Sequence, residues 1–161
     1  MPLYHATTHV FIPGQVVAAT ADQARIPRGL TALEAGRPDG APSRLRCVFA
    51  ADSPAAAATI IDAELPPGTK YRVYEVEMEF PRKGPMRLVR EIERRLADSK
   101  QVEALVAEYW LPRHNWRLFE YFAPSMPVVA EHLLPSDMAQ AVVRLDYGWD
   151  TDLSKQLSGE P

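Results

Sequence analysis

The chain of 161 residues lacks several features that would assign its class at once. It has a single cysteine, Cys47, which excludes an internal disulfide framework and any metal site built from several thiolates. No apolar run approaches the ~20 residues of a membrane-spanning helix. No basic segment followed by an apolar one marks a signal peptide. The net charge is only −3, so overall charge does not direct the protein to nucleic acid or to an anionic membrane. We therefore expect a cytoplasmic protein without a membrane partner, and secretion without a cleavable signal is the open alternative.

Motifs of the common enzyme classes are also absent. The chain has no glycine-rich phosphate loop, no dinucleotide-binding fingerprint, no nucleophile elbow and no zinc-protease helix motif. His5 and His9 flank a turn and have no carboxylate pair beside them, so we expect no metal site. Cys47 lies in an apolar, strand-like run, where a cysteine is more often a small buried side chain than a nucleophile.

Proline, in contrast, is abundant, with 15 prolines against 8 glycines. Because proline interrupts helices and central strands, long elements should be few. Apolar or alternating segments predict short strands at 3–6, 11–17, 45–50, 70–80, 116–122 and 127–133. Helical spacing predicts helices at 54–64, 86–98 and 102–109, and 138–145 fits either a strand or a short helix.

The order of these elements favours an α+β fold with a mainly antiparallel sheet, because strands outnumber helices and do not alternate with them. A long irregular loop is expected at 21–43, with a helical turn at 30–35. We predict one domain over residues 1–149 and a polar, frayed tail over 150–161.

Three short motifs, in their order along the chain, resemble the ADP-ribosyltransferases of the His-Tyr-Glu type, in particular the small rifamycin ADP-ribosyltransferases. They are Tyr4-His5-Ala6-Thr7, Val48-Phe49-Ala50-Ala51 and Phe119-Glu120-Tyr121. The turn at Pro13-Gly14, the small-residue helix at 54–64 and the alternating strand at 71–77 also match the family's order of elements. Each motif is short, and the resemblance depends on their order.

The resemblance implies an ADP-ribosyltransferase-like split sheet with a few short helices, and NAD as co-substrate. In that family the bond between nicotinamide and ribose is broken, nicotinamide is released and ADP-ribose passes to an acceptor. Carried over by position, Glu120 stabilises the developing positive charge and His5 holds the adenosine-side ribose. Phe49 stands where the family has a tyrosine that stacks on nicotinamide. The residues assigned to catalysis are Glu120 and His5, and those assigned to NAD binding are His5, Ala6, Thr7, Phe49, Tyr71 and Tyr121.

Several alternatives stay open at this point. His5 is also compatible with an inert hydrogen-bonded histidine, and Glu120 with a solvent-facing residue of an edge strand. Water as acceptor would make the protein an NAD glycohydrolase, and loss of the tyrosine would suit an inactive nucleotide- or protein-binding module. The acceptor is a protein, a nucleic acid or a small molecule. Four arginines on the 86–98 helix, at positions 87, 90, 94 and 95, form either a target-binding stripe or a solvated, salt-bridged face.

Overall fold

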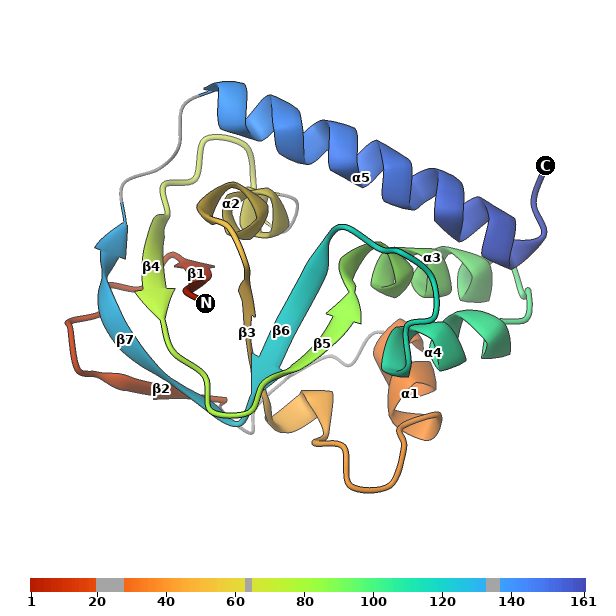
Figure 1. Ribbon diagram of the computed structural model, residues 1–161, viewed down its shortest axis with the longest axis horizontal. Coiled ribbons are helices and arrows are strands. Elements are labelled where there is room, and N and C mark those ends of the chain that lie inside the picture. Colours follow the sequence, from red (N-terminus) through yellow and green to blue (C-terminus); the bar gives the residue numbers. More distant parts are fainter. Residues whose placement is uncertain (20–27, 63–64, 133–136) are drawn as a thin grey trace.

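The computed structural model describes residues 1–19, 28–62, 65–132 and 137–161, and over these it has the predicted α+β fold (Figure 1). Seven strands form one antiparallel sheet in the order β2-β7-β4-β1-β3-β6-β5. The strands are β1 (Leu3–Thr7), β2 (Val16–Ala18), β3 (Val48–Ala51), β4 (Arg72–Val76), β5 (Arg82–Pro85), β6 (Phe119–Ala123) and β7 (Ser125–His132). The five α-helices are α1 (Arg28–Ala35), α2 (Pro54–Asp62), α3 (Met86–Ala97), α4 (Glu103–Trp110) and α5 (Asp137–Ser158). No helix in the described ranges is long and apolar enough to cross a membrane.

The sheet has a seam between β1 and β3. The register pairs β1 with β4 continuously from Leu3↔Val76 to Thr7↔Arg72. Between β1 and β3, however, the only residue pair is Tyr4↔Ala51. The sheet therefore consists of two strand groups, β2-β7-β4-β1 and β3-β6-β5, which meet at one point.

Helices pack on the sheet in two groups. Helix α2 begins at Pro54 after Ser53, whose hydroxyl accepts a hydrogen bond from the amide of Ala56 at 3.1 Å. Its buried alanines, Ala55–Ala58, allow the helix to lie close to β1. Helices α1, α3 and α4 form the other group and enclose a hydrophobic core together with β6. The largest side chains of this core are Leu33, Leu88, Ile92, Leu105, Tyr109, Trp110 and Phe122. Helix α5 crosses over both groups (Figure 1).

The predicted helices at 86–98 and 102–109 are confirmed within one residue at each end, but several strands differ from the prediction. Of the strand expected at 11–17, only the end is extended, because Pro13 and Gly14 form a turn. The segment expected at 45–50 begins instead with a 3-10 turn, η1 (Arg44–Arg46), before β3. The sequence does not predict strand β5 at all, since Gly84 and Pro85 disfavour strands. Its place at the sheet edge tolerates the proline.

Parts of other predicted segments lie outside the described residues. These are 21–27 of the expected loop at 21–43, residues 63–64 of the helix at 54–64, and residue 133 of the strand at 127–133. Within the described part of the loop, the helical turn expected at 30–35 is the longer helix α1.

The prediction of a frayed tail over 150–161 is wrong, because α5 continues to Ser158. Asp150 and Ser154 are completely buried. The Asp150 carboxylate accepts hydrogen bonds from the backbone amides of Arg117 and Leu118, at 3.1 and 3.0 Å. Leu153 and Leu157 pack against the core of α1, α3 and α4. The hydrophobicity pattern of the sequence does not predict this part of the helix, because the buried Asp150 holds it through hydrogen bonds to backbone amides.

Candidate functional site

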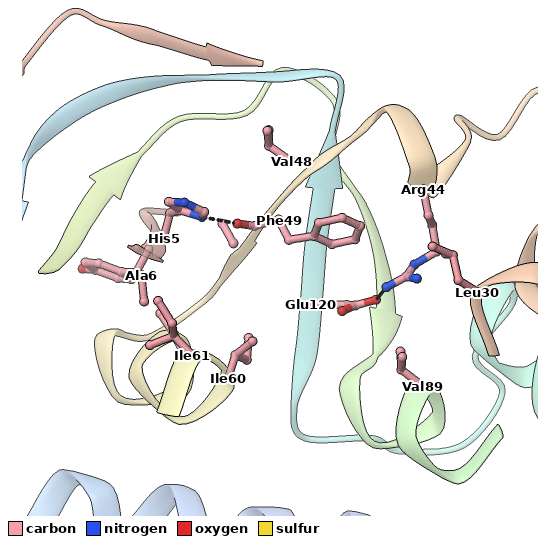
Figure 2. Close-up of a pocket in the computed structure, with 13 residues that line it drawn as sticks. His5, Ala6, Leu30, Arg44, Val48, Phe49, Ile60, Ile61, Val89 and Glu120 are labelled. Carbon is pink, nitrogen blue, oxygen red and sulfur yellow. Dashed lines mark hydrogen bonds and ion pairs between the residues drawn. The ribbon is translucent and has the colours of Figure 1, made fainter. Parts of the chain in front are cut away.

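A cavity of about 430 Å³ opens at the seam of the sheet, between α2 and the strands (Figure 2). Strands β1 and β3 and helix α2 supply most of its lining, and α1, η1, α3 and β6 contribute one residue each. The lining residues are Tyr4, His5, Ala6, Leu30, Arg44, Val48, Phe49, Ala50, Ala57, Ile60, Ile61, Val89 and Glu120. The volume lies in the range of small-molecule sites, roughly 300–1,000 Å³.

Four of the residues singled out in the sequence meet at this cavity: His5, Ala6, Phe49 and Glu120. They come from three strands, and Phe49 lies between His5 and Glu120 (Figure 2). The seam makes this possible, because β1 and β3 diverge beyond their single residue pair. Residues distant in sequence are thus brought to one concave surface.

Thr7, Tyr71 and Tyr121 are described residues that do not line this cavity. The Thr7 hydroxyl is buried and accepts a hydrogen bond from the amide of His9 at 3.1 Å. Tyr121 follows Glu120 on β6, so its side chain points to the opposite face of the sheet and packs with Leu3 and other core residues. Tyr71 packs near α2, where burial and the nearby carboxylate of Asp62 raise its pKa to about 12.

His5 is held by a hydrogen bond from its Nδ1 to the carbonyl oxygen of Phe49, at 2.7 Å. A carbonyl only accepts, so Nδ1 carries the proton. Burial lowers the pKa of His5, and the charge of nearby His9 lowers it further, although the bond to Phe49 opposes both. The imidazole is therefore neutral at pH 7, and Nε2 is left as a hydrogen-bond acceptor.

Phe49 is half-buried and exposes part of its ring to the cavity. The guanidinium carbon of Arg44 lies 4.8 Å from the centre of this ring. The ring of Phe122, on the neighbouring strand, lies 5.7 Å away at a tilt of 36°. The side chain is thus fixed from two directions, and one of its contacts is a cation.

Glu120 is buried, with 8% of its surface exposed, and lies on a strand that is paired on both sides. The alternative of a solvent-facing edge residue is therefore wrong. Its Oε1 atom accepts hydrogen bonds from Nη2 of Arg44 and from the hydroxyl of Tyr109, both at 2.5 Å. A buried carboxylate needs such a partner, because removing an uncompensated charge from water is costly.

Arg44 is the main site residue that the sequence analysis missed. Burial alone would lower its pKa, but the charge of Glu120 and the bonds to Glu120 and Tyr109 raise that pKa above its usual value. The guanidinium therefore stays protonated. Glu34 on α1 fixes η1 in place, since its carboxylate accepts from the amide of Arg44 at 2.7 Å and from the hydroxyl of Ser43 at 2.9 Å. One signal was present: a glutamate within an aromatic strand implies a cationic partner elsewhere in the chain.

A second cavity, of about 590 Å³, adjoins the first at three shared residues, Ile60, Val89 and Glu120. The rest of its lining is Thr59, Met86, Arg90 and Tyr147. The carboxylate of Glu120 thus belongs to both cavities.

The arginines of α3 divide into two kinds. Arg87, Arg94 and Arg95 form ion pairs with Glu91 or Glu160, which confirms the salt-bridged alternative for these three. Arg90 instead lines the second cavity, with its guanidinium 5.8 Å from the ring centre of Tyr147. Of these four arginines, Arg90 lines a cavity that also contains Glu120.

Within the described ranges, no group of three or more histidine, cysteine, aspartate or glutamate side chains is placed to hold a metal ion. Comparison of the chain with protein-family models, with curated proteins and with solved structures finds no match. The geometry of the two cavities is therefore the basis for any functional conclusion.

Proposed function

We propose that the protein binds NAD in the first cavity and transfers its ADP-ribose to an acceptor, with release of nicotinamide. One observation carries the proposal: His5 and Glu120, from strands β1 and β6, line a single cavity with Phe49 between them (Figure 2). The seam of the sheet adds support, since two strand groups meeting at one residue pair suit an ADP-ribosyltransferase-like split sheet.

The chemistry assigns a role to each group. The bond between C1′ of the ribose and the nicotinamide nitrogen breaks, and its electron pair leaves with neutral nicotinamide. A nucleophile of the acceptor then bonds to C1′ and gives up its proton to solvent. The carboxylate of Glu120 stabilises the positive charge that develops on the ribose. Arg44 and Tyr109 hold this carboxylate in place, so it does not have to reorient during the reaction. Nε2 of His5 accepts a hydrogen bond from a hydroxyl of the other ribose.

The second cavity suits the acceptor, because it reaches Glu120 from another side. When water enters this cavity in place of an acceptor, the same residues perform NAD hydrolysis. The two reactions differ only in their product, which is a labelled acceptor in one and free ADP-ribose in the other.

A second candidate is an inactive module that binds a nucleotide without cleaving it. One observation favours it: the guanidinium of Arg44 already contacts the ring of Phe49, the residue expected to stack on nicotinamide. A positively charged nicotinamide ring would meet another cation there. An assay of nicotinamide release separates the candidates, because the module would release none from NAD, whichever nucleotide it binds.

Incubation with NAD labelled on the adenine side, with and without cell extract as a source of acceptors, tests the proposal. We expect nicotinamide release by the wild type and a loss of roughly 100-fold or more in Glu120→Gln. His5→Ala should raise KM for NAD. Glu131→Gln is the matched control, since Glu131 is an exposed carboxylate on β7 paired with Arg72. Absence of nicotinamide release from the wild type would refute the proposed reaction.

A further inference from the structure

The carboxylate of Glu120 is bound asymmetrically. Both of its donors, Nη2 of Arg44 and the hydroxyl of Tyr109, bind the same oxygen, Oε1. Nε of Arg44 donates in turn to the Tyr109 hydroxyl at 2.8 Å, which closes a triangle of three buried side chains. No described residue donates a hydrogen bond to Oε2. In Figure 2, one oxygen of Glu120 meets Arg44 and the other points away from it.

The backbone of β5 makes room for this triangle. Gly84 pairs directly with Glu120 across the two strands. The ring of Tyr109 lies over Gly84, where a Cβ atom would be only 2.3 Å from Cε2 of that ring. The glycine thus lets a tyrosine of α4 reach the carboxylate of β6. Tyr109 is completely buried and packs on Trp110 and Phe122, so its hydroxyl has a fixed position.

We infer that Arg44 and Tyr109 are positioning residues that fix Oε1 and leave Oε2 as the acceptor for ligand. Because Arg44 already compensates the negative charge, the group that meets Oε2 is a neutral hydroxyl rather than an ammonium or a guanidinium. The inference deepens the proposed function and rests on it for its kinetic test. Beyond that function, it states that the rate of nicotinamide release depends on Arg44 and Tyr109, although neither residue touches the reacting bond.

Tyr109→Phe is the first test, because it removes one donor to Oε1 and keeps the ring in place. We expect kcat for nicotinamide release to fall by about 10- to 100-fold with little change in KM, as a misoriented group loses rate and not binding. Tyr74→Phe is the matched control, since it also deletes a buried hydroxyl, one that accepts from the amide of Phe11 at 3.0 Å in a different core cluster. Equal kinetics for the two variants would overturn the inference.

Substitutions of Arg44 separate charge from geometry. Arg44→Lys keeps the charge but cannot donate to Glu120 and Tyr109 together, so it should recover only part of the kcat that Arg44→Met loses. Full recovery in Arg44→Lys would contradict a positioning role, since charge alone would then suffice.

Thermal unfolding tests the triangle without any activity. Arg44→Met leaves the Glu120 carboxylate buried without its cation, and we expect a clear fall in Tm. Adding Glu120→Gln should restore part of that loss, so that the double variant melts above Arg44→Met alone. Strictly additive losses would overturn the inference. A wild type that releases no nicotinamide would refute the proposed function, while this cycle still tests whether Arg44 fixes the carboxylate of Glu120.

Discussion

Substitution of Gly84 by alanine gives the sharpest test of how the site is built. An added Cβ would lie 2.3 Å from Cε2 and 2.4 Å from Cζ of Tyr109. Ordinary contacts begin near 3.4 Å, so the ring must move by about 1 Å. Tyr109 is completely buried and packs on Trp110 and Phe122, so its movement must displace these neighbours as well.

Overpacking of this kind costs about 1–3 kcal/mol of unfolding free energy. The movement also carries the Tyr109 hydroxyl away from Glu120 and Arg44, which it now meets at 2.5 and 2.8 Å. A shift of roughly 1 Å would take both contacts beyond hydrogen-bond range. We therefore expect Gly84→Ala to lose stability and nicotinamide release together.

Urea unfolding and a nicotinamide-release assay on the same preparation measure both effects. Gly148→Ala is the matched control, because Gly148 lies on α5 and a Cβ added there would have nothing within 4 Å. A helical Gly→Ala change should stabilise by about 0.5–1 kcal/mol. If Gly84→Ala unfolds at the wild-type urea concentration with wild-type turnover, the contact of Tyr109 with Glu120 is not what the geometry indicates.

Three further outcomes are expected. Asp150→Ala should cost about 2–4 kcal/mol in urea unfolding, because the amides of Arg117 and Leu118 lose a buried charged acceptor; a loss under about 1 kcal/mol would contradict that anchor. Because burial lowers the pKa of His5 in the folded protein, His5 of the unfolded chain is protonated at a higher pH than His5 of the folded chain. The free energy of unfolding should therefore fall as pH drops below about 6.5. His5→Gln should flatten that slope, and an unchanged slope would assign it to other groups. Arg90→Ala should lower the ratio of labelled acceptor to free ADP-ribose, and an unaltered ratio would remove Arg90 from the acceptor site.

Local patterns are sufficient where burial follows sequence spacing. The sequence predicts helix α3 almost to the residue, because Leu88 and Ile92 recur at helical spacing and are buried, and Val89 and Leu96 pack against the same core. The same holds for the start of α2, which Ser53 and Pro54 mark. The residues within these elements determine where they form, so the sequence alone is sufficient to predict them.

Other elements depend on partners far away in the chain. Strand β5 carries a glycine and a proline, and it forms because β6 pairs with it and Tyr109 fills the space over Gly84. The C-terminal half of α5 is fixed by Asp150, whose partners lie on the loop before β6. Arg44 belongs to the same class, because its role exists only once η1 faces Glu120. None of these contacts leaves a periodic trace in the sequence.

The seam between β1 and β3 has a mechanical consequence. Because one residue pair joins the two strand groups, their relative movement breaks few backbone hydrogen bonds. The hydrogen bond from His5 to the carbonyl of Phe49 crosses the seam. It joins the two strand groups where β1 and β3 form no backbone pairs. A molecule that engages Nε2 of His5 and Oε2 of Glu120 at once would clamp both groups together. Amide hydrogen exchange in β1 and β3 would then slow on binding, so the exchange rate of these strands would show whether the cavity is occupied.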